Sequence, residues 1–178
     1  MWIPYTDSVV VVKCNELKEG AAPPTLVPMD GKEQLAPLRT LLLQFDPTIP
    51  AKTLDGLSFS GLRDMLLTFG ATDPKVVQAV NAAEAEFWKL CQGPTSIDDS
   101  DRVLGFDCGG SQLVNERAFP AGTVASPSMA DIALMEKILA LIEAKQIPAP
   151  APIEQRWSCG STSSMNIAGG KVTSADDL

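Results

Sequence analysis

The sequence predicts an α+β domain in which helices cover one face of a small antiparallel sheet. Three observations support this fold class. A run of β-branched residues follows the amino terminus, several segments show the apolar spacing of helices, and strand-like segments precede and follow the last helix. The expected order of elements is therefore β, α, α, α, β, α, β, and the part from Leu113 to Trp157 is similar to half of a ferredoxin-like unit.

The amino-terminal half is predicted to contain one strand and three helices. Residues 5–13 are rich in valine, which is typical of a strand that is buried on both faces at its centre. Apolar residues then recur at helical spacing in three segments, residues 32–45, 58–69 and 74–92. Asp73 is suited to be the N-cap of the third helix, with Pro74 as its first residue. The proline-containing segments between these elements are predicted to be surface loops: residues 15–31 and 46–56.

The carboxyl-terminal half is predicted to form a hairpin, a helix and a final strand. Residues 103–119 have the pattern of two strands joined by a turn at Gly109-Gly110. Ser128-Met129-Ala130-Asp131 is close to a capping box and therefore predicts the start of a helix. Three prolines at alternate positions then require an extended approach to a strand over residues 153–157. Residues 159–178 are rich in serine and glycine.

Composition excludes several classes of function. The 178 residues suffice for one domain with a buried core, and the net charge of −8 argues against nucleic-acid binding. The chain has no histidine, which excludes histidine-based triads and histidine-containing zinc sites. None of the four cysteines is spaced as CxxC, so we expect free thiols and no metal site.

The amino-terminal residues lack the features of a targeting or membrane segment. No basic region precedes the apolar run of residues 9–12, and that run is far too short for a signal peptide or a membrane span. We therefore expect no direct membrane insertion. We also expect that the chain starts within folded structure, as a fragment of a longer protein would.

Glu154 and Arg156 form the first candidate site. Side chains two residues apart on a strand share a face, so the acid and the base would project together. Arginine offers a planar fork of donors that keeps its charge, and it could hold an oxygen on which negative charge develops. Glutamate could orient the arginine, bind substrate hydroxyls or take a proton. The alternative is a same-face ion pair on an exposed strand, which would contribute little.

Cys108 forms the second candidate site, beside Gly109-Gly110. A glycine pair permits a tight turn and the close approach of a ligand, and a partly exposed thiol near positive charge would be reactive. The alternative is a hairpin turn that contains a small, half-buried cysteine. If the site is real, Cys108 should react faster with thiol reagents than Cys91, which ends an apolar helix face. No phosphate-binding glycine motif is present, so we expect no FAD on this chain alone.

Five segments of the chain resemble the L-galactono-1,4-lactone dehydrogenases, flavoenzymes of the aldonolactone oxidase group. The resemblance covers essentially all 178 residues. It is carried by residues 2–7 with 9–12 (WIPYTD and VVVV), 83–88 (AEAEFW), 104–110 (LGFDCGG), 119–123 (FPAGT) and 147–157.

The resemblance implies a fold, a cofactor and partners. Members of the family combine an FAD-binding domain of the vanillyl-alcohol-oxidase type with a cap domain that binds the lactone, and this chain matches the cap. The residues that match Glu154 and Arg156 line the substrate site, and the cysteine that matches Cys108 is an oxidation-sensitive thiol near it. Electrons leave to cytochrome c in the last step of ascorbate synthesis. Plant members also take part in the assembly of respiratory complex I.

The chain departs from the family pattern in ways that leave two functions open. The FAD domain is absent from the sequence, residues 95–102 diverge, and Leu113 occupies the place of an aromatic residue. Residues 1–158 are expected to form the cap, and residues 159–178 a loop that leads to a missing strand. The first hypothesis is the cap of a mitochondrial lactone dehydrogenase, at the inner membrane or in the intermembrane space. The alternative is a non-catalytic subunit or assembly factor on a respiratory or photosynthetic membrane complex, for which a plastid location is open.

Overall fold

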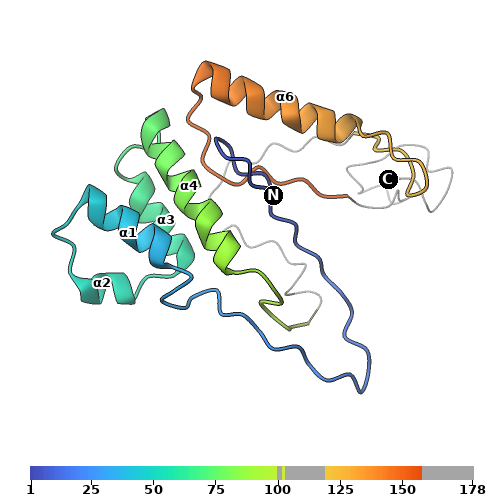
Figure 1. Ribbon diagram of the computed structural model, residues 1–178, viewed down its shortest axis with the longest axis horizontal. Coiled ribbons are helices and arrows are strands. Elements are labelled where there is room, and N and C mark those ends of the chain that lie inside the picture. Colours follow the sequence, from blue (N-terminus) through green and yellow to red (C-terminus); the bar gives the residue numbers. More distant parts are fainter. Residues whose placement is uncertain (100–101, 103–118, 158–178) are drawn as a thin grey trace. The chain divides into compact units, whose positions relative to one another are not determined.

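The computed structural model describes residues 1–99, 102 and 119–157, and helices dominate this part of the chain (Figure 1). Five helices are present there: α1 Ala36–Phe45, α2 Ala51–Asp55, α3 Phe59–Leu67, α4 Pro74–Leu90 and α6 Ala130–Lys145. Four of them confirm the predicted helices. The short α2 lies in a segment that was predicted to be a loop, and that prediction was wrong.

The chain divides into two compact units. The first contains residues Met1–Gly105 and Ile142–Glu154, and the second contains Phe106–Leu141 and Gln155–Leu178. Each unit is described by itself. None of the helices in the described part is long and apolar enough to cross a membrane.

Side chains cap the starts of α3 and α4, and the cap at Asp73 was predicted. The Ser58 hydroxyl oxygen accepts a hydrogen bond of 3.2 Å from the backbone N–H of Gly61. The Asp73 carboxylate accepts one of 2.9 Å from the N–H of Lys75, and Pro74 is the first helical residue. In each case the side chain satisfies an N–H that has no carbonyl partner within the helix. α1 begins four residues later than predicted, with Pro37 in its first turn.

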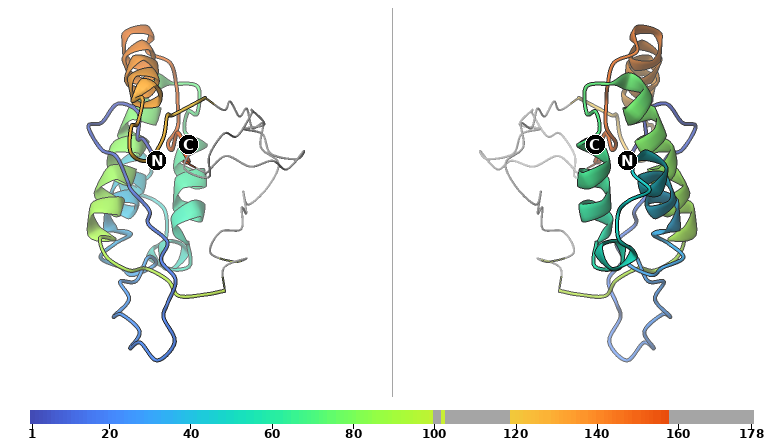
Figure 2. Two further views of the ribbon diagram at one scale, coloured as in Figure 1. Left: turned by 90° about the vertical axis from the view of Figure 1, so that its right-hand side faces the viewer. Right: turned by 90° about the vertical axis from the view of Figure 1, so that its left-hand side faces the viewer.

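The main hydrophobic core of the first unit lies between α1, α3 and α4. α1 contacts both other helices, and all three lie side by side in Figures 1 and 2. Phe59 and Phe87 stack with ring centroids 4.3 Å apart, and Trp88 meets both rings edge-on. The fully or almost fully buried members of this core are Leu35, Leu38, Leu42, Leu54, Leu62, Leu66, Val80, Ala83, Phe87 and Cys91.

A second, smaller cluster forms on another side of α4. Ala85 packs with Ile3 and Ala151, which come from near the two ends of the described chain, and Val10 and Trp88 border them. α4 therefore has buried residues on two sides rather than on a single apolar stripe. This arrangement makes α4 the element that connects the helical core to residues 1–10 and 147–154.

The predicted sheet is not present in the described part of the chain, so the α+β prediction was wrong there. Residues 5–13 do not form a strand. Trp2 pairs with Val9 and with Ile153 through isolated antiparallel bridges, and Gly122 pairs with Pro127 in the same way. The predicted hairpin over residues 103–119 lies almost entirely outside the described residues. The structure here is a helical cluster with bridged extended segments.

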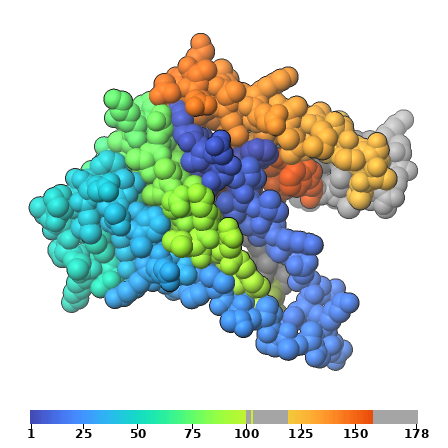
Figure 3. All heavy atoms as spheres, viewed as in Figure 1, coloured from blue at the N-terminus to red at the C-terminus, as the bar shows by residue number. Residues whose placement is uncertain are grey.

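A tight turn at Tyr5 and the lack of an adjoining ladder among the described residues explain why the valine run is not a strand there. Tyr5 has a φ of 65°, and the Thr6 hydroxyl donates to the carbonyl of Ile3 (2.8 Å) and accepts from the N–H of Ser8 (3.1 Å). The chain therefore doubles back before the valine run begins. β-branched residues favour a strand only where a pleated, half-buried surface receives them. Val11 and Val12 are instead 80% and 66% exposed, on a segment that leaves the helical cluster in Figure 3.

Glu84 is the buried charged side chain among the described residues of this unit. Its side chain is 1% exposed, and its Oε2 lies 3.6 Å from Nε of Arg63, an ion pair too long for a hydrogen bond. The indole N–H of Trp88 donates to Oε1 at 3.4 Å. Burial raises the pKa of Glu84, against the opposing effects of Arg63 and Trp88. The folded chain therefore holds this proton to a higher pH than the unfolded chain does.

Replacing Arg63 by methionine is expected to lower the free energy of unfolding by about 3 kcal/mol at neutral pH, because it leaves a buried carboxylate without its counter-charge. The loss should shrink at acid pH, because protonated Glu84 needs no counter-charge. The pKa of Glu84 is higher in the folded chain than in the unfolded chain, so the free energy of unfolding falls as the pH rises from the unfolded pKa through the folded pKa. Urea denaturation of the wild type and of Arg63→Met at several pH values measures how this loss of unfolding free energy depends on pH.

Arg39→Met is the matched control. Arg39 lies 3.5 Å from Asp55, whose side chain is 55% exposed and keeps its hydration, so the loss should stay within about 1 kcal/mol. Equal losses for the two variants, or a loss for Arg63→Met that does not change with pH, would contradict the assignment of a buried charge.

Candidate functional site

Within the first unit, one buried side chain of α4 binds the segment that leads to Glu154. Asn81, on α4, is fully buried. Its amide nitrogen donates to the carbonyls of Pro4 (3.0 Å) and Ala149 (2.9 Å), and its oxygen accepts from the N–H of Ala151 (2.9 Å). Three backbone groups from two distant segments are therefore satisfied by one amide, which uses its acceptor and both donors.

Trp2 and Tyr5 hold the same segment at two further points. The N–H and carbonyl of Trp2 exchange hydrogen bonds of 2.8 and 2.9 Å with the carbonyl and N–H of Ile153. The Tyr5 hydroxyl donates to the carbonyl of Ile147 and, at 3.2 Å, to that of Ile142. The chain is thus held from the last turn of α6 up to the residue before Glu154.

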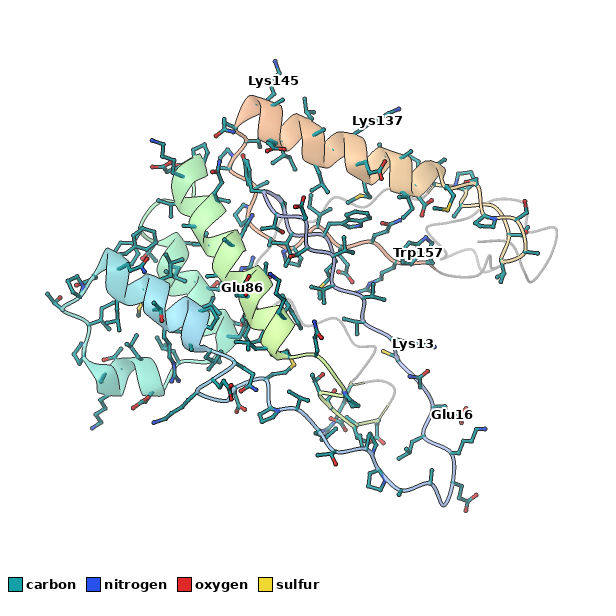
Figure 4. The ribbon with its side chains drawn as sticks, viewed as in Figure 1. Lys13, Glu16, Glu86, Lys137, Lys145 and Trp157 are labelled. Carbon is teal, nitrogen blue, oxygen red and sulfur yellow. The ribbon has the colours of Figure 1, made fainter. Side chains whose placement is uncertain are left out.

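In the second unit, Asp131 holds the residues that follow Glu154. Its Oδ2 accepts a hydrogen bond of 2.7 Å from the side-chain amide of Gln155 and another of 2.7 Å from the indole N–H of Trp157. These two bonds are called the Asp131 contact below. Figure 4 labels Trp157 at the end of the described carboxyl-terminal segment.

The exposure of residues 153–156 alternates. Glu154 and Arg156 are exposed, whereas Ile153 and Gln155 are half-buried. An extended chain produces this pattern, because successive side chains leave opposite sides of the backbone. Both candidate residues are therefore accessible to a ligand, and both also take part in interactions within the protein. Glu154 ends the first unit and Arg156 belongs to the second, so each is placed within its own unit.

The described residues include two cysteines, Cys14 and Cys91. Cys108 and Gly109-Gly110 lie outside the described residues, so that site stays a prediction. Cys91 is 4% exposed, and burial raises its pKa, both of which disfavour the reactive thiolate. Cys14 is exposed. The slow reaction expected for Cys91 thus has a structural reason, while the reactivity of Cys108 remains to be measured.

A hollow of about 320 Å³ lies beside the Asp131 contact in the second unit. Four of its described lining residues are apolar, namely Ala121, Pro127, Met129 and Ile132, and the other two are Asp131 and Trp157. The indole N–H of Trp157 and the Oδ2 atom of Asp131 are already bonded to each other. A polyhydroxylated ligand needs a partner for each hydroxyl group. The described lining of this hollow therefore suits an apolar group better than a sugar lactone.

The starts of α4 and α6 do not fit the diphosphate of a dinucleotide cofactor. Such a group binds to free N–H groups at a helix N-terminus, where the dipole favours negative charge. At α4 the Asp73 carboxylate already occupies this position, and the first turn of α6 carries Asp131. Each carboxylate would repel a phosphate. Within the described ranges, no group of three or more potential ligands is arranged to hold a metal ion.

Sequence reasoning missed the residues that hold the site in place. Asn81 shares a helical side with Val77 and Ala85, and a polar residue within such a stripe is the only local signal for its burial. Tyr5 was assigned to the strand that is not present. Asp131 was assigned to a capping box, but the N–H of Ser128 donates to the carbonyl of Ala121 at 2.8 Å instead. The predicted capping box, in which Asp131 would accept from the N–H of Ser128, is therefore not formed.

Comparison with known proteins identifies the class to which this chain belongs. Residues 1–174 match the family of D-arabinono-1,4-lactone oxidase. The chain is a member of that family, and the resemblance to the aldonolactone oxidase group is confirmed.

The similar proteins include plant enzymes with mitochondrial names. The chain is 46% identical over 180 residues to L-galactono-1,4-lactone dehydrogenase 1, mitochondrial, of Oryza sativa subsp. japonica. That match covers 94% of the chain and 30% of the rice protein. It is 41% identical over 191 residues to L-galactono-1,4-lactone dehydrogenase, mitochondrial, of Arabidopsis thaliana. That match covers 100% of the chain and 31% of the Arabidopsis protein. The chain thus spans about 30% of the length of these relatives.

Proposed function

We propose that this chain is the substrate-binding cap of a flavin-dependent aldonolactone dehydrogenase, and that its substrate is L-galactono-1,4-lactone. The observation that carries the proposal is the 46% identity to a protein of that name along 94% of the chain. The structure supports it within each unit separately. Asn81 and Trp2 hold the segment that ends at Glu154, the Asp131 contact holds the segment that contains Arg156, and both candidate side chains are exposed. Rigid support beneath exposed polar side chains is what a binding site requires.

Arg156 and Glu154 have distinct roles in this proposal. The guanidinium of Arg156 donates two parallel N–H bonds to the lactone oxygens and stabilises negative charge that develops on them. The carboxylate of Glu154 accepts hydrogen bonds from the lactone hydroxyls, which orients the ring. FAD, bound by the remainder of a longer polypeptide, supplies the electron acceptor. In this proposal the phosphates of FAD are also bound by that remainder.

The proposal extends to the surroundings of the enzyme. The relatives carry a mitochondrial designation in their names, and we propose the same organelle for this protein. Cytochrome c is the proposed electron acceptor, and the flavin domain of the same polypeptide is the proposed neighbour of the cap.

The experiment is to purify the longest natural polypeptide that contains this chain and to record its flavin spectrum before and after addition of L-galactono-1,4-lactone. Bleaching of the flavin, followed by reduction of cytochrome c, is expected, and D-arabinono-1,4-lactone serves as the comparison substrate. A polypeptide that lacks flavin, does not oxidise either lactone and purifies with a large respiratory or photosynthetic complex would overturn the proposal. It would favour the non-catalytic subunit or assembly factor instead.

A further inference from the structure

We infer that Asp131 is a positioning residue for Arg156, and that it sets the side of the backbone from which the guanidinium projects. The inference rests on the proposed function only for the role of Arg156 at the lactone. The contact itself lies within the second unit of the chain.

The first argument concerns the strength of the Asp131 contact. Two donors, the amide of Gln155 and the indole of Trp157, reach the same oxygen of Asp131 at 2.7 Å. Hydrogen bonds to a carboxylate are about twice as strong as those between neutral groups. They hold the segment even though Trp157 is 55% exposed and gains little from burial.

The second argument concerns direction. Gln155 and Trp157 are the residues on either side of Arg156, and both reach Asp131. In an extended chain the residue between two such neighbours leaves the backbone on the opposite side. Arg156 is accordingly exposed while Gln155 is half-buried. The Asp131 contact thus constrains the backbone on both sides of Arg156.

The third argument is that Asp131 is not required as the helix cap. The N–H of Ala130 donates to the Ser128 hydroxyl oxygen at 3.4 Å, so Ser128 takes part in capping α6. The position of Ser128 depends on the preceding turn at Gly122, which has a φ of 92° and where a Cβ would lie 2.5 Å from the carbonyl oxygen of Ser126. Because Ser128 takes part in the cap, the Oδ2 atom of Asp131 can accept the hydrogen bonds from Gln155 and Trp157, which flank Arg156.

The test uses the full-length flavoprotein and three variants. Asp131→Ala removes the acceptor, Asp131→Asn keeps a neutral acceptor oxygen in the same place, and Glu136→Gln removes an exposed carboxylate from the same helix as a control. We expect Asp131→Ala to lower kcat/KM for the lactone about 10- to 100-fold, since small misplacements of a catalytic group have effects of this size. Asp131→Asn should recover most of this loss, and Glu136→Gln should match the wild type.

A double mutant separates positioning from general destabilisation. In an Arg156→Ala background, Asp131→Ala should have little further effect on kcat/KM, because the group that it positions is gone. Additive losses in the double mutant, or a normal kcat/KM in Asp131→Ala, would overturn the inference.

A readout independent of activity distinguishes failure of this inference from failure of the proposed function. The rate at which phenylglyoxal modifies Arg156, followed by mass spectrometry, should rise severalfold in Asp131→Ala and stay unchanged in Glu136→Gln. If the wild type does not oxidise the lactone, the proposed function fails and the modification rates alone decide the inference. Equal rates in all variants would overturn it.

Discussion

Replacing Asn81 by leucine is expected to lower the free energy of unfolding by about 3–5 kcal/mol. Leucine has the same branched shape and number of side-chain heavy atoms and a better helix propensity, so neither a cavity nor loss of helix preference accounts for the change. The cause is the loss of three hydrogen bonds to Pro4, Ala149 and Ala151, two of which are buried residues. Leaving buried backbone groups unpaired costs about 1–3 kcal/mol each, and partial access of water reduces the total.

Urea denaturation of Asn81→Leu beside Gln78→Leu measures this difference. Gln78 lies one turn earlier on α4 and bonds to Gln146 at 3.0 Å in an exposed position, so its replacement should change stability by about 0.5 kcal/mol or less. If the two variants were equally stable, Asn81 would not be the residue that joins α4 to the terminal segments.

Arg156→Ala in the full-length enzyme is expected to lower turnover of the lactone by about 10²- to 10³-fold, the range observed when a donor to a developing negative charge is removed. Arg156→Lys should recover little of this loss. Lysine is a compact point charge, and it cannot supply the two-pronged contact of a guanidinium. Steady-state kinetics with L-galactono-1,4-lactone provides the measurement.

Arg102→Ala is the control for the removal of an arginine. Arg102 has a side chain that is 73% exposed, lies 3.7 Å from Asp98, and has no role in the proposed site. Its replacement should leave turnover unchanged. Near-normal kinetics in Arg156→Ala would return Glu154 and Arg156 to the alternative of a surface ion pair.

Helices were the part of the fold that local sequence could predict. Asp73-Pro74 and Ser58 satisfy N–H groups within their own helices, and apolar spacing depends only on neighbours one turn away. These signals are short-range, so α1, α3, α4 and α6 were found without knowledge of the rest of the structure. The five-residue α2 is too short to show a periodic pattern.

Strands were overpredicted because a strand depends on its partner. The valines of residues 9–12 have high strand propensity, but the turn at Tyr5 and the lack of an adjoining ladder in the described residues leave Val11 and Val12 exposed. Glu154 and Arg156 were singled out from the pattern of residues 153–157, and the resemblance to a family then favoured a substrate site for them. Without the resemblance, the pattern of Glu154 and Arg156 favours an ion pair in solvent.

The sequence by itself determined α1, α3, α4 and α6, the cap of α4 and the family to which the chain belongs, because these depend on adjacent residues or on extended similarity. The tertiary structure alone decided what supports the site. Asn81 and Asp131 have the same local pattern as any polar residue on a helix, and their roles arise only when α4 and α6 meet segments that are distant in the sequence. Hydrogen bonds between groups separated by 24 to 77 residues have no local signature, so only the folded chain reveals them.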